Sequence, residues 1–304
     1  MPRHRPLSTL FALVTVAGLT LAAQNAPQTQ NLRANGTDLS YVDQGTGAPV
    51  VFVHGAVADL RYWEPQRDAI AKQNRFVAYT FRYHGAGPWT DEGKQYSPAT
   101  HAADLAAFIA GLKSGPVHLV GLSYGGALAA LVALKQPELI RSLTLAEPAL
   151  FGILADLPEG KAALESWTTG AAPMMAALKQ GDAVQATKLL SALVNGEPVE
   201  NFEKLPPVLR QMLLDNARTL PLLFAAPPES VTCDALRTIK TPTLVIRGAN
   251  TPLIFSKTNE VVARCIPGSE SIAIPDASHV MSYQNAAAFN QALLQFVQKH
   301  RGSN

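Results

Sequence analysis

The feature that most constrains the fold is a series of short, continuous apolar runs rich in β-branched residues, separated by stretches of helical length. Val50-Val51-Phe52-Val53 is the clearest run, and it shows no alternation of apolar and polar residues. Strands buried on both faces have this pattern, and such strands belong to parallel sheets covered by helices. The further runs are 76–81, 117–120, 142–146, 243–246 and 271–274. The sequence therefore predicts an α/β fold with a mostly parallel, doubly wound sheet.

Helical stretches separate these strand-like runs. They fall at about 62–74, 98–112, 124–136, 256–265 and 284–299. Ahead of the first run, Asn35-Gly36 lies between two short stretches at 31–33 and 39–42. This dipeptide favours a tight turn between antiparallel strands, so we expect the sheet to begin with a β-hairpin.

The alternation of strands and helices stops between about residues 149 and 231. That stretch has no strand-like run, and helical periodicity recurs near 159–168, 183–195 and 207–217. The prolines expected to end helices there are Pro158, Pro173, Pro198, Pro206, Pro207, Pro227 and Pro228. Because the stretch is inserted between two strands, we predict a helical lid at 149–231 over a core of residues 32–148 and 232–300.

The N-terminus has the pattern of an export signal. Arg3, His4 and Arg5 precede an apolar run from Leu10 to Ala23, which would span only about 21 Å as a helix. A charged start, a short apolar segment and small residues at its end are typical of a secretory signal peptide. We predict that residues 1–23 are this signal, and hence a periplasmic or secreted protein without stable membrane insertion. An uncleaved N-terminal anchor is the alternative.

Composition bears on partners and metals. The chain has 25 Lys and Arg against 23 Asp and Glu, and the signal region supplies two of the positive charges, so no nucleic-acid partner is expected. The two cysteines and seven histidines show no zinc-ligand spacing. Export permits a disulfide, but we expect Cys233 to begin a short helix and Cys265 to end another on the opposite side of the sheet. Two buried thiols are therefore expected.

Gly121-Leu122-Ser123-Tyr124-Gly125-Gly126 follows the run at 117–120 and precedes an alanine-rich helical stretch. The bare pattern Gly-x-Ser-x-Gly is weak, but the strand before it and the helix after it are informative. A serine on such a turn has a strained backbone, and small neighbours let the chain pass. Its hydroxyl lies at a helix N-terminus, where the dipole favours developing negative charge. We predict Ser123 as a nucleophile; the alternative is a glycine-rich loop with an incidental serine.

His54-Gly55-Ala56 closes the run at 50–53. On this type of fold the loop supplies one backbone N–H to an oxyanion hole, which we assign to Ala56, and the N–H of Tyr124 supplies the other. Gly55 lets the backbone approach the substrate. We expect His54 to hold the loop by hydrogen bonding rather than to titrate in catalysis.

A serine hydroxyl needs a general base at neutral pH. His279 lies in the loop after the last strand-like run, and active sites of α/β proteins assemble in loops at the carboxyl ends of strands. The histidines in a glycine-rich turn, at a helix start, in a strand and in the C-terminal tail fit less well; they are His84, His101, His118 and His300. We therefore predict His279 as the base.

The acidic partner of the base is the most discriminating residue. The turn after the run at 243–246 is its usual place, but it contains no carboxylate. Asn250 in that turn can accept a hydrogen bond but cannot stabilise an imidazolium by charge. Glu147 ends the preceding strand-like run at the equivalent edge of the sheet, and we predict it as the third member. The alternatives are that Glu147 pairs with an arginine at the lid hinge, or that Asp276 is the acid.

The His54-Gly55 loop, the Ser123 turn, an inserted lid and the terminal His279 occur in an order that resembles the α/β-hydrolase family over about residues 32–299. The resemblance implies a twisted, mostly parallel sheet with flanking helices and a helical lid. The segment 82–87 resembles the family's glycine-containing turn after the fourth strand, but it lacks the usual leading aspartate.

The position of Glu147 narrows the resemblance. An acid after the sixth strand is similar to the zearalenone lactonases, which use Ser, Glu and His, and to one branch of the haloalkane dehalogenases. Dehalogenases and epoxide hydrolases need aspartate at position 123, so Ser123 implies acyl transfer.

These observations predict a serine hydrolase that cleaves a small, apolar carboxylic ester or lactone through an acyl-enzyme, without a metal or organic cofactor. Apolar lid residues such as Phe151 and Trp167 favour such a substrate. A carbon–carbon bond hydrolase or a perhydrolase with the same triad is the alternative, and a non-catalytic binding protein on this fold is a third. The expected partner is a small-molecule substrate, and the sequence indicates no oligomeric state.

Overall fold

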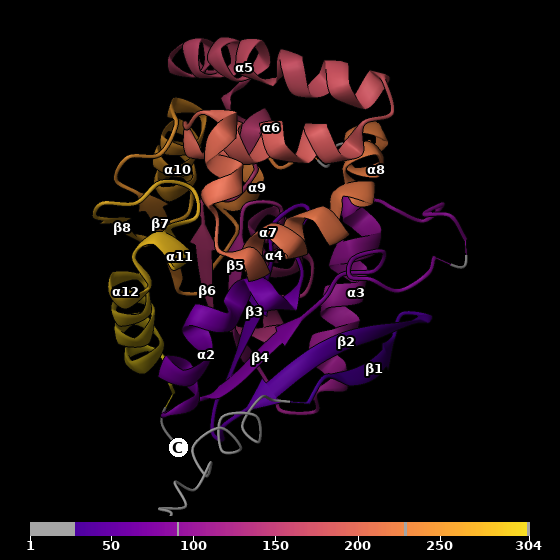
Figure 1. Cartoon of the computed structure of the whole chain (residues 1–304). Helices are drawn as coiled ribbons and strands as arrows, with labels where there is room; N and C mark the ends of the chain where they lie inside the picture. The colour runs from indigo at the N-terminus through magenta and orange to yellow at the C-terminus, as the bar shows by residue number, and fades with distance from the viewer. Residues whose placement is uncertain (1–27, 90, 228–229, 303–304) are drawn as a thin grey trace, which may run out of the picture.

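The computed structural model describes residues 28–89, 91–227 and 230–302. Its strands are β1 (Gln30–Ala34), β2 (Thr37–Gln44), β3 (Pro49–Val53), β4 (Arg75–Tyr79), β5 (Val117–Leu122), β6 (Ile140–Ala146), β7 (Thr243–Gly248) and β8 (Glu270–Ile274). They form one sheet in the order β1-β2-β4-β3-β5-β6-β7-β8, in which β1–β2 and β2–β4 are antiparallel and the other pairs are parallel. Every apolar run singled out in the sequence forms a strand, and the α/β class is confirmed (Figure 1).

The expected hairpin is formed by β1 and β2. Ala34 pairs with Thr37, and the two residues between them, Asn35 and Gly36, have φ values of 45° and 76°. Two successive positive φ values define the turn that best matches the twist of paired strands, and Asn-Gly is the dipeptide that adopts it most readily.

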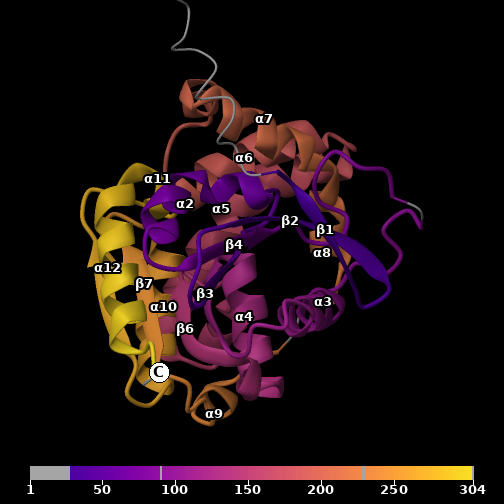
Figure 2. The same ribbon diagram turned by 90° about the horizontal axis from the view of Figure 1, so that it is seen from below.

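Helices cover both faces of the sheet. Outside the inserted segment they are η1 (Leu60–Trp63), α2 (Glu64–Ala71), α3 (Pro98–Gly111), α4 (Tyr124–Lys135), η2 (Pro137–Leu139), α10 (Leu253–Cys265), α11 (Met281–Gln284) and α12 (Ala286–Lys299). Figure 2 shows the strands between α2 and α12 on one side and α3 and α4 on the other. α10 packs in the same hydrophobic cluster as α3 and α4.

The pattern of the apolar runs follows from these two layers. In β3, Val51 and Val53 belong to the cluster with α3 and α4, whereas Val50 and Phe52 belong to the cluster with α2 and α12. Successive side chains of a strand point to opposite faces, so a strand covered on both faces needs apolar residues at every position. β8 departs from the expectation: it lies at one edge of the sheet, and only its last residue is buried.

The segment between β6 and β7 is helical. Its elements are η3 (Phe151–Leu154), η4 (Pro158–Gly160), α5 (Lys161–Lys179), α6 (Ala183–Asn195), η5 (Val199–Lys204), α7 (Pro207–Asp215), η6 (Ala217–Thr219), α8 (Leu220–Ala225) and α9 (Cys233–Leu236). The part from η3 to α8 lies over the carboxyl ends of the parallel strands (Figure 1). We refer to residues 149–231 as the lid, the range that the sequence analysis gave it.

Pro173 does not end a helix, contrary to the sequence-based expectation. It lies inside α5, which continues to Lys179. A proline in a helix leaves the carbonyl four residues earlier without its donor. Here that carbonyl belongs to Thr169, and both residues are exposed, so solvent can satisfy the freed group.

The expectation of two free thiols is also wrong. Cys233 and Cys265 form a disulfide, with their Cα atoms 5.2 Å apart. The helix starts and ends were predicted correctly, but α9 and α10 pack on the same face of the sheet, in the cluster that contains both Leu236 and Cys265. The error lay in the assumed side of α9.

No helix of the described residues is long and apolar enough to cross a membrane. The predicted signal peptide, residues 1–23, lies outside the described residues.

Candidate active site

Ser123 occupies the turn between β5 and α4, at the carboxyl edge of the sheet. Its backbone angles, φ 54° and ψ −119°, form a conformation that residues other than glycine rarely adopt. Two backbone hydrogen bonds hold it: the Ser123 N–H donates to Ala146 O at 2.9 Å, and the Ala149 N–H donates to Ser123 O at 2.9 Å. The strained turn expected from the sequence is therefore present, and it is fixed to the end of β6.

Close backbone contacts around Ser123 require glycine. A Cβ at Gly121 would collide with the backbone of Gly125, and a Cβ at Gly125 would collide with the carbonyl of His54. On the loop after β3, a Cβ at Gly55 would lie 3.4 Å from the Cβ of Ser123. This loop is thus seated directly beside the serine.

Glu147 follows β6 immediately and is 0% exposed. Its carboxylate accepts three hydrogen bonds: from the Gly248 N–H to Oε1 at 2.8 Å, from the Thr251 hydroxyl to Oε2 at 2.9 Å, and from His279 Nδ1 to Oε2 at 2.6 Å. A buried carboxylate needs such donors, because its desolvation is costly when it is unpaired. The structure therefore places Glu147 against the histidine, as predicted.

His279 lies in the loop between β8 and α11 and is 4% exposed. Ser278 fixes this loop: its N–H donates to Gln284 Oε1 at 2.7 Å, and its hydroxyl donates to Asn195 O at 2.9 Å. Because the carboxylate of Glu147 only accepts, Nδ1 of His279 carries the hydrogen and Nε2 is left as an acceptor. A general base for a serine needs this tautomer.

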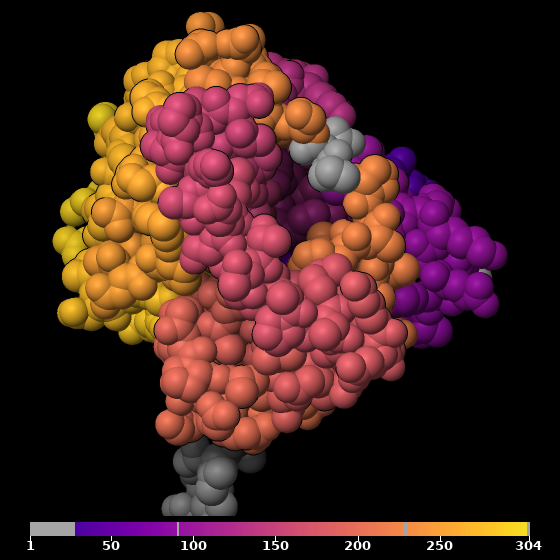
Figure 3. All heavy atoms as spheres, turned by 90° about the horizontal axis from the view of Figure 1, so that it is seen from above, coloured from indigo at the N-terminus to yellow at the C-terminus, as the bar shows by residue number. Residues whose placement is uncertain are grey.

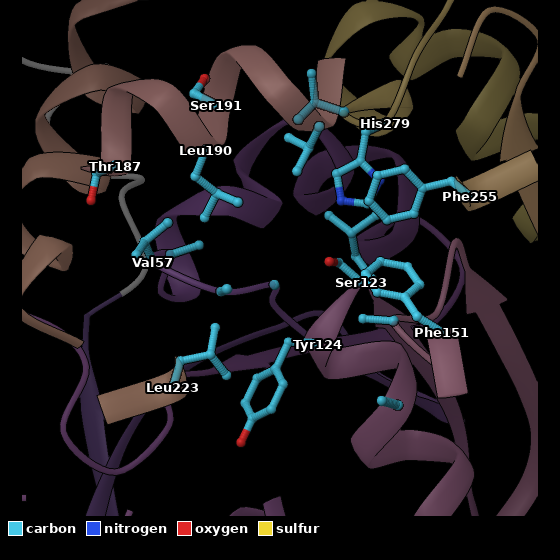
Figure 4. A pocket seen from close by; sticks show the side chains of 18 of the residues that line it. Val57, Ser123, Tyr124, Phe151, Thr187, Leu190, Ser191, Leu223, Phe255 and His279 are labelled. Carbon is cyan, nitrogen blue, oxygen red and sulfur yellow. The ribbon is translucent and has the colours of Figure 1, made fainter. Parts of the chain in front are cut away.

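A cavity of about 350 Å³ lies between the sheet edge and the lid, and both Ser123 and His279 line it. Figure 4 shows a ring nitrogen of His279 directed to the side of the cavity where the Ser123 hydroxyl lies. Among the described residues, no hydrogen bond joins the Ser123 hydroxyl to the His279 ring. Catalytic hydrogen bonds are often long before substrate binds and shorten in the complex. The three predicted residues are thus brought together, Glu147 by direct contact with His279 and Ser123 as its neighbour in the cavity wall.

The walls of the cavity are mostly apolar. Within the described residues, no Asp, Glu, Lys or Arg side chain lines it. Figure 3 shows its mouth as a hollow between lid segments, with atoms from an earlier part of the chain at the floor. The larger lid residues that line it are Leu150, Phe151, Trp167, Leu190, Val194, Leu205, Leu209, Leu213, Leu223 and Phe224.

Ala56 and Tyr124, the predicted oxyanion donors, both line the cavity next to Ser123. Tyr124 is the first residue of α4, so its N–H has no acceptor within that helix. Val57, which follows Ala56, has a φ of 48°. A positive φ is costly for a β-branched residue, and such strain is concentrated at functional loops.

His54 is held as the sequence analysis expected. Its Nε2 accepts from the Phe81 N–H at 3.2 Å, so its Nδ1 carries the hydrogen that it shares with Gly55 O at 2.8 Å. Complete burial holds the pKa of His54 well below its ordinary value, so the ring stays neutral. Both nitrogens bind backbone, and this leaves none for the substrate.

Three further histidines are also buried and neutral. Burial lowers the pKa of His84 and His118 to about 4 and holds that of His101 well below its ordinary value. His101 Nδ1 hydrogen-bonds the Tyr124 hydroxyl at 2.8 Å. In the described ranges, no group of three or more His, Cys, Asp or Glu residues is arranged to hold a metal ion.

Within the described residues, neither the Asp276 nor the Asn250 side chain hydrogen-bonds His279. Asp276 and Asn250 are exposed, and the Asn250 N–H donates to Ala277 O. The lid-hinge alternative, in which Glu147 pairs with an arginine, is not what the structure has: the ion-pair partner of Glu147 among the described residues is His279.

Two residues at the site were missed by the sequence analysis. Thr251 supports the carboxylate of Glu147, and Phe255 on α10 stacks on the His279 ring with centroids 3.9 Å apart and an interplanar angle of 24°. Thr251 lies in the turn after β7, where the acid is usually found, and its hydroxyl could have indicated a donor to a carboxylate from another strand. Nothing local in the sequence marks Phe255, because its contact depends on where α10 meets the loop after β8.

The sheet order and the geometry around Ser123 define a class of enzyme, the α/β hydrolases. A family model described as "Alpha/beta hydrolase family" matches residues 50–292. The chain belongs to this family. Hydrolysis of ester bonds, expected from the sequence, agrees with the structural neighbours given below.

Among curated proteins, the chain is similar to a putative non-heme bromoperoxidase BpoC of Mycobacterium tuberculosis, with 27% identity over 85% of this chain and 97% of the relative. It is also similar to a 2-hydroxymuconate semialdehyde hydrolase of a Pseudomonas species, with 24% identity over 88% and 93% of the two chains.

Among solved structures, it is similar to Est816, described as an N-acyl homoserine lactone degrading enzyme, with 25% identity, a TM-score of 0.70 and coverage of 88% of this chain and 100% of the other. A thermophilic esterase from Thermogutta terrifontis has 24% identity and a TM-score of 0.69 over 90% of this chain and 100% of the other, which supports the shared fold.

Proposed function

We propose that this protein is a serine hydrolase that cleaves a small, uncharged, apolar carboxylic ester or lactone through an acyl-enzyme. The observation that carries the proposal is the hydrogen bond between the buried Glu147 and His279, beside Ser123 on the wall of an apolar cavity. Ser123 is the nucleophile, His279 the general base, and Glu147 the group that orients the imidazole and stabilises its charge.

In the first half-reaction, Ser123 Oγ attacks the carbonyl carbon while His279 Nε2 takes the hydroxyl proton. The electron pair of the carbonyl π bond moves to oxygen, and the N–H groups of Ala56 and Tyr124 stabilise the resulting oxyanion. The intermediate then collapses, the bond to the alkoxy oxygen breaks, and that oxygen takes the proton from His279. The alcohol leaves from an ester and stays attached to the acyl group from a lactone.

In the second half-reaction, water attacks the acyl-enzyme and gives a proton to His279. The new tetrahedral intermediate collapses with cleavage of the bond to Ser123 Oγ, which takes that proton back. The products are the free enzyme and a carboxylic acid.

The uncharged walls of the cavity favour this substrate class over an acidic one. A carboxylate buried without a cationic partner pays a large desolvation cost, and the described lining offers no Lys or Arg. The named relatives include a hydrolase of 2-hydroxy-6-oxo-2,4-heptadienoate, whose substrate is a carboxylate. A carbon–carbon bond hydrolase of that kind is therefore the weaker candidate for this chain.

A perhydrolase is the second candidate. The same acyl-enzyme yields a peracid when hydrogen peroxide takes the place of water, and two non-heme haloperoxidases are among the relatives. Measuring peracid and acid from one ester across a range of peroxide concentrations separates the two reactions. A perhydrolase forms peracid as the main product at peroxide concentrations where water still greatly exceeds it.

We further propose that the protein is periplasmic or secreted. The signal-like residues 1–23 and the Cys233–Cys265 disulfide support this, because disulfides persist in oxidising compartments. Fractionation of cells that express the full chain, with mass determination of the N-terminus, tests it. An intact N-terminus on protein from the cytoplasm would contradict it.

Hydrolysis of p-nitrophenyl esters and lactones of increasing chain length tests the reaction, with Ser123→Ala as the control. We expect turnover of uncharged short and medium esters, loss of activity in Ser123→Ala, and labelling of the wild type alone by a fluorophosphonate. Wild-type protein that neither turns over these substrates nor reacts with the fluorophosphonate would point to a non-catalytic binding protein.

A further inference from the structure

Thr187 carries a buried hydroxyl that has no hydrogen-bond partner in the described part of the chain. The residue lies on α6, is 0% exposed, and lines the cavity. A buried hydroxyl without a partner destabilises the folded protein, so such groups are rare unless something else uses them.

Other threonines on helices of this protein bond their hydroxyl groups locally, whether they are buried, as Thr258 is, or exposed, as Thr168 is. The Thr258 hydroxyl on α10 donates to Ile254 O at 2.7 Å, and the Thr168 hydroxyl on α5 donates to Leu164 O at 2.8 Å. Each of these acceptors is the carbonyl four residues earlier, the usual acceptor for a helical threonine. The Thr187 hydroxyl does not make this bond.

The direction of the Thr187 hydroxyl differs from that of its neighbour on α6. Figure 4 shows the Thr187 oxygen turned towards the side of the cavity where Val57 lies, whereas the oxygen of Ser191 on the same helix is turned the other way. Val57, Leu190 and Leu223 surround this part of the cavity with apolar surface. A single polar group in an otherwise apolar pocket mainly fixes the orientation of a ligand and adds less to its affinity.

A second unpartnered polar atom lies on the same helix. Asn195 lines the cavity, its amide nitrogen donates to Ser191 O at 2.9 Å, and its buried Oδ1 has no donor in the described residues. Thr187 and Asn195 are two turns of helix apart, about 12 Å along the axis at 1.5 Å per residue. Asn195 is at the His279 end, because its carbonyl binds Ser278. Thr187 is therefore at the end of α6 remote from the catalytic histidine.

We propose that Thr187 binds a hydroxyl, oxo or amide group of the substrate, remote from the bond that is cleaved. The substrate class is then a neutral ester or lactone with an apolar body and one such hydrogen-bonding group, rather than an ester of a plain hydrocarbon chain. This inference rests on the proposed function, since it places the reacting carbonyl at Ser123.

The first test measures stability and needs no substrate. Thr187→Val keeps the shape of the side chain and removes the hydroxyl, so it removes an unpaired buried polar group. We expect the melting temperature to rise by roughly 2–4 °C. The matched control is Thr258→Val on α10, which is equally buried but whose hydroxyl is already bonded, and we expect the melting temperature to fall there. A lower melting temperature for Thr187→Val would show that the hydroxyl supports the fold, and it would overturn the proposal.

The second test measures selectivity with two substrate series, one for each half of an ester. The first compares p-nitrophenyl octanoate with octanoates that carry an oxo group at successive carbons. The second compares alkyl acetates with monoacetates of the corresponding diols, followed by acid release. We expect at least one functionalised substrate to lose roughly 3- to 10-fold in kcat/KM in Thr187→Val, while its parent keeps its value. Equal changes for every functionalised substrate and its parent would overturn the proposal.

Failure of the proposed function gives a different result. Binding of the same compounds to the Ser123→Ala protein, measured by calorimetry, does not depend on turnover. Binding that is weakened by Thr187→Val in that background, together with a wild type that hydrolyses none of the compounds, would support the binding site and contradict the reaction. Hydrolysis of parent esters with no effect of Thr187→Val on any compound would do the reverse.

Discussion

At the scale of single residues, Glu147 is the acceptor on which the site geometry depends. The carboxylate takes one donor from each of three segments: the end of β7, the turn after it, and the loop after β8. Because the acid follows β6, the turn after β7 does not have to carry it and instead supplies hydrogen-bond donors to it. One buried anion thus fixes the relative positions of three loops.

Replacing the acid separates its charge from its shape. Glu147→Gln keeps the size of the side chain but cannot stabilise an imidazolium, and its amide favours the wrong histidine tautomer. We expect kcat to fall by roughly 10²–10⁴-fold. Asn250→Ala, which alters the exposed side chain in the usual acid position, is the control and should retain most activity. A larger loss in Asn250→Ala than in Glu147→Gln would contradict the assignment of the acid.

Thr251 acts through Glu147 and does not line the cavity. Thr251→Val removes one hydrogen bond to a buried carboxylate, so the carboxylate and the imidazole bound to it lose a constraint. We expect kcat to fall by roughly 10-fold with little change in KM, and Thr251→Ser to restore most of it. Steady-state kinetics that separate kcat from KM check this. A change confined to KM, or no rescue by serine, would show that Thr251 only packs.

The sequence was sufficient to predict which residues meet at the candidate site, where their position follows from the end of a strand. Ser123 follows β5 directly, His279 lies in the loop after β8, and Glu147 followed by elimination, because it is the carboxylate at the end of the neighbouring strand. Thr187 and Phe255 were not predictable, since their roles depend on which side of a helix meets the cavity. That choice is made by packing between segments far apart in the chain.

At the scale of elements, the strands were predictable and the lid was predictable only in part. Burial on both faces requires an unbroken apolar run, so a few consecutive residues are enough to predict such a strand. The sequence of the lid predicts its helices less clearly. These helices bury only one side, and no single residue type marks where each of them ends. Pro173 was interpreted as a stop because its exposure was not visible in the sequence, and α8 was not anticipated. The Cys233–Cys265 bond was missed because it depends on which face of the sheet α9 occupies.

The disulfide joins α9 to α10, the helix that places Phe255 on the His279 ring. With the cysteines 32 positions apart in the sequence, loop closure alone predicts that the bond stabilises the fold by about 3–4 kcal/mol. We expect Cys233→Ser/Cys265→Ser to lower the free energy of unfolding by about this amount in urea titrations. Reductant should destabilise the wild type and leave the double variant unchanged. Equal stability of the two proteins without reductant would contradict a structural role for the bond.

At the scale of the whole molecule, the core contains several neutral histidines, and they make its stability depend on pH. Burial holds the pKa values of His54 and His101 well below the ordinary 6.5 and lowers those of His84 and His118 to about 4. In the unfolded chain all four regain a pKa near 6.5. Between pH 6.5 and about 4 the unfolded state therefore binds more protons than the folded state. The carboxylates with lowered pKa values, such as Glu159 and Glu203, have an ordinary value of 4.5 and so add to this only at the acid end of the range.

The sign follows from this difference: stability is complete above pH 6.5 and is lost as the pH falls towards 4. Each such histidine contributes up to about 1.4 kcal/mol per pH unit within that range. Urea unfolding at pH 7, 6 and 5 measures the loss. His118→Gln removes one titrating ring from β5, so it should reduce the slope of the unfolding free energy against pH by up to the contribution of one proton. The wild-type measurement stands alone if that variant does not fold. Stability that is constant or rises from pH 7 to pH 5 would mean that these rings take up protons in the folded state, and hence that water or a neighbouring anion reaches them inside the core.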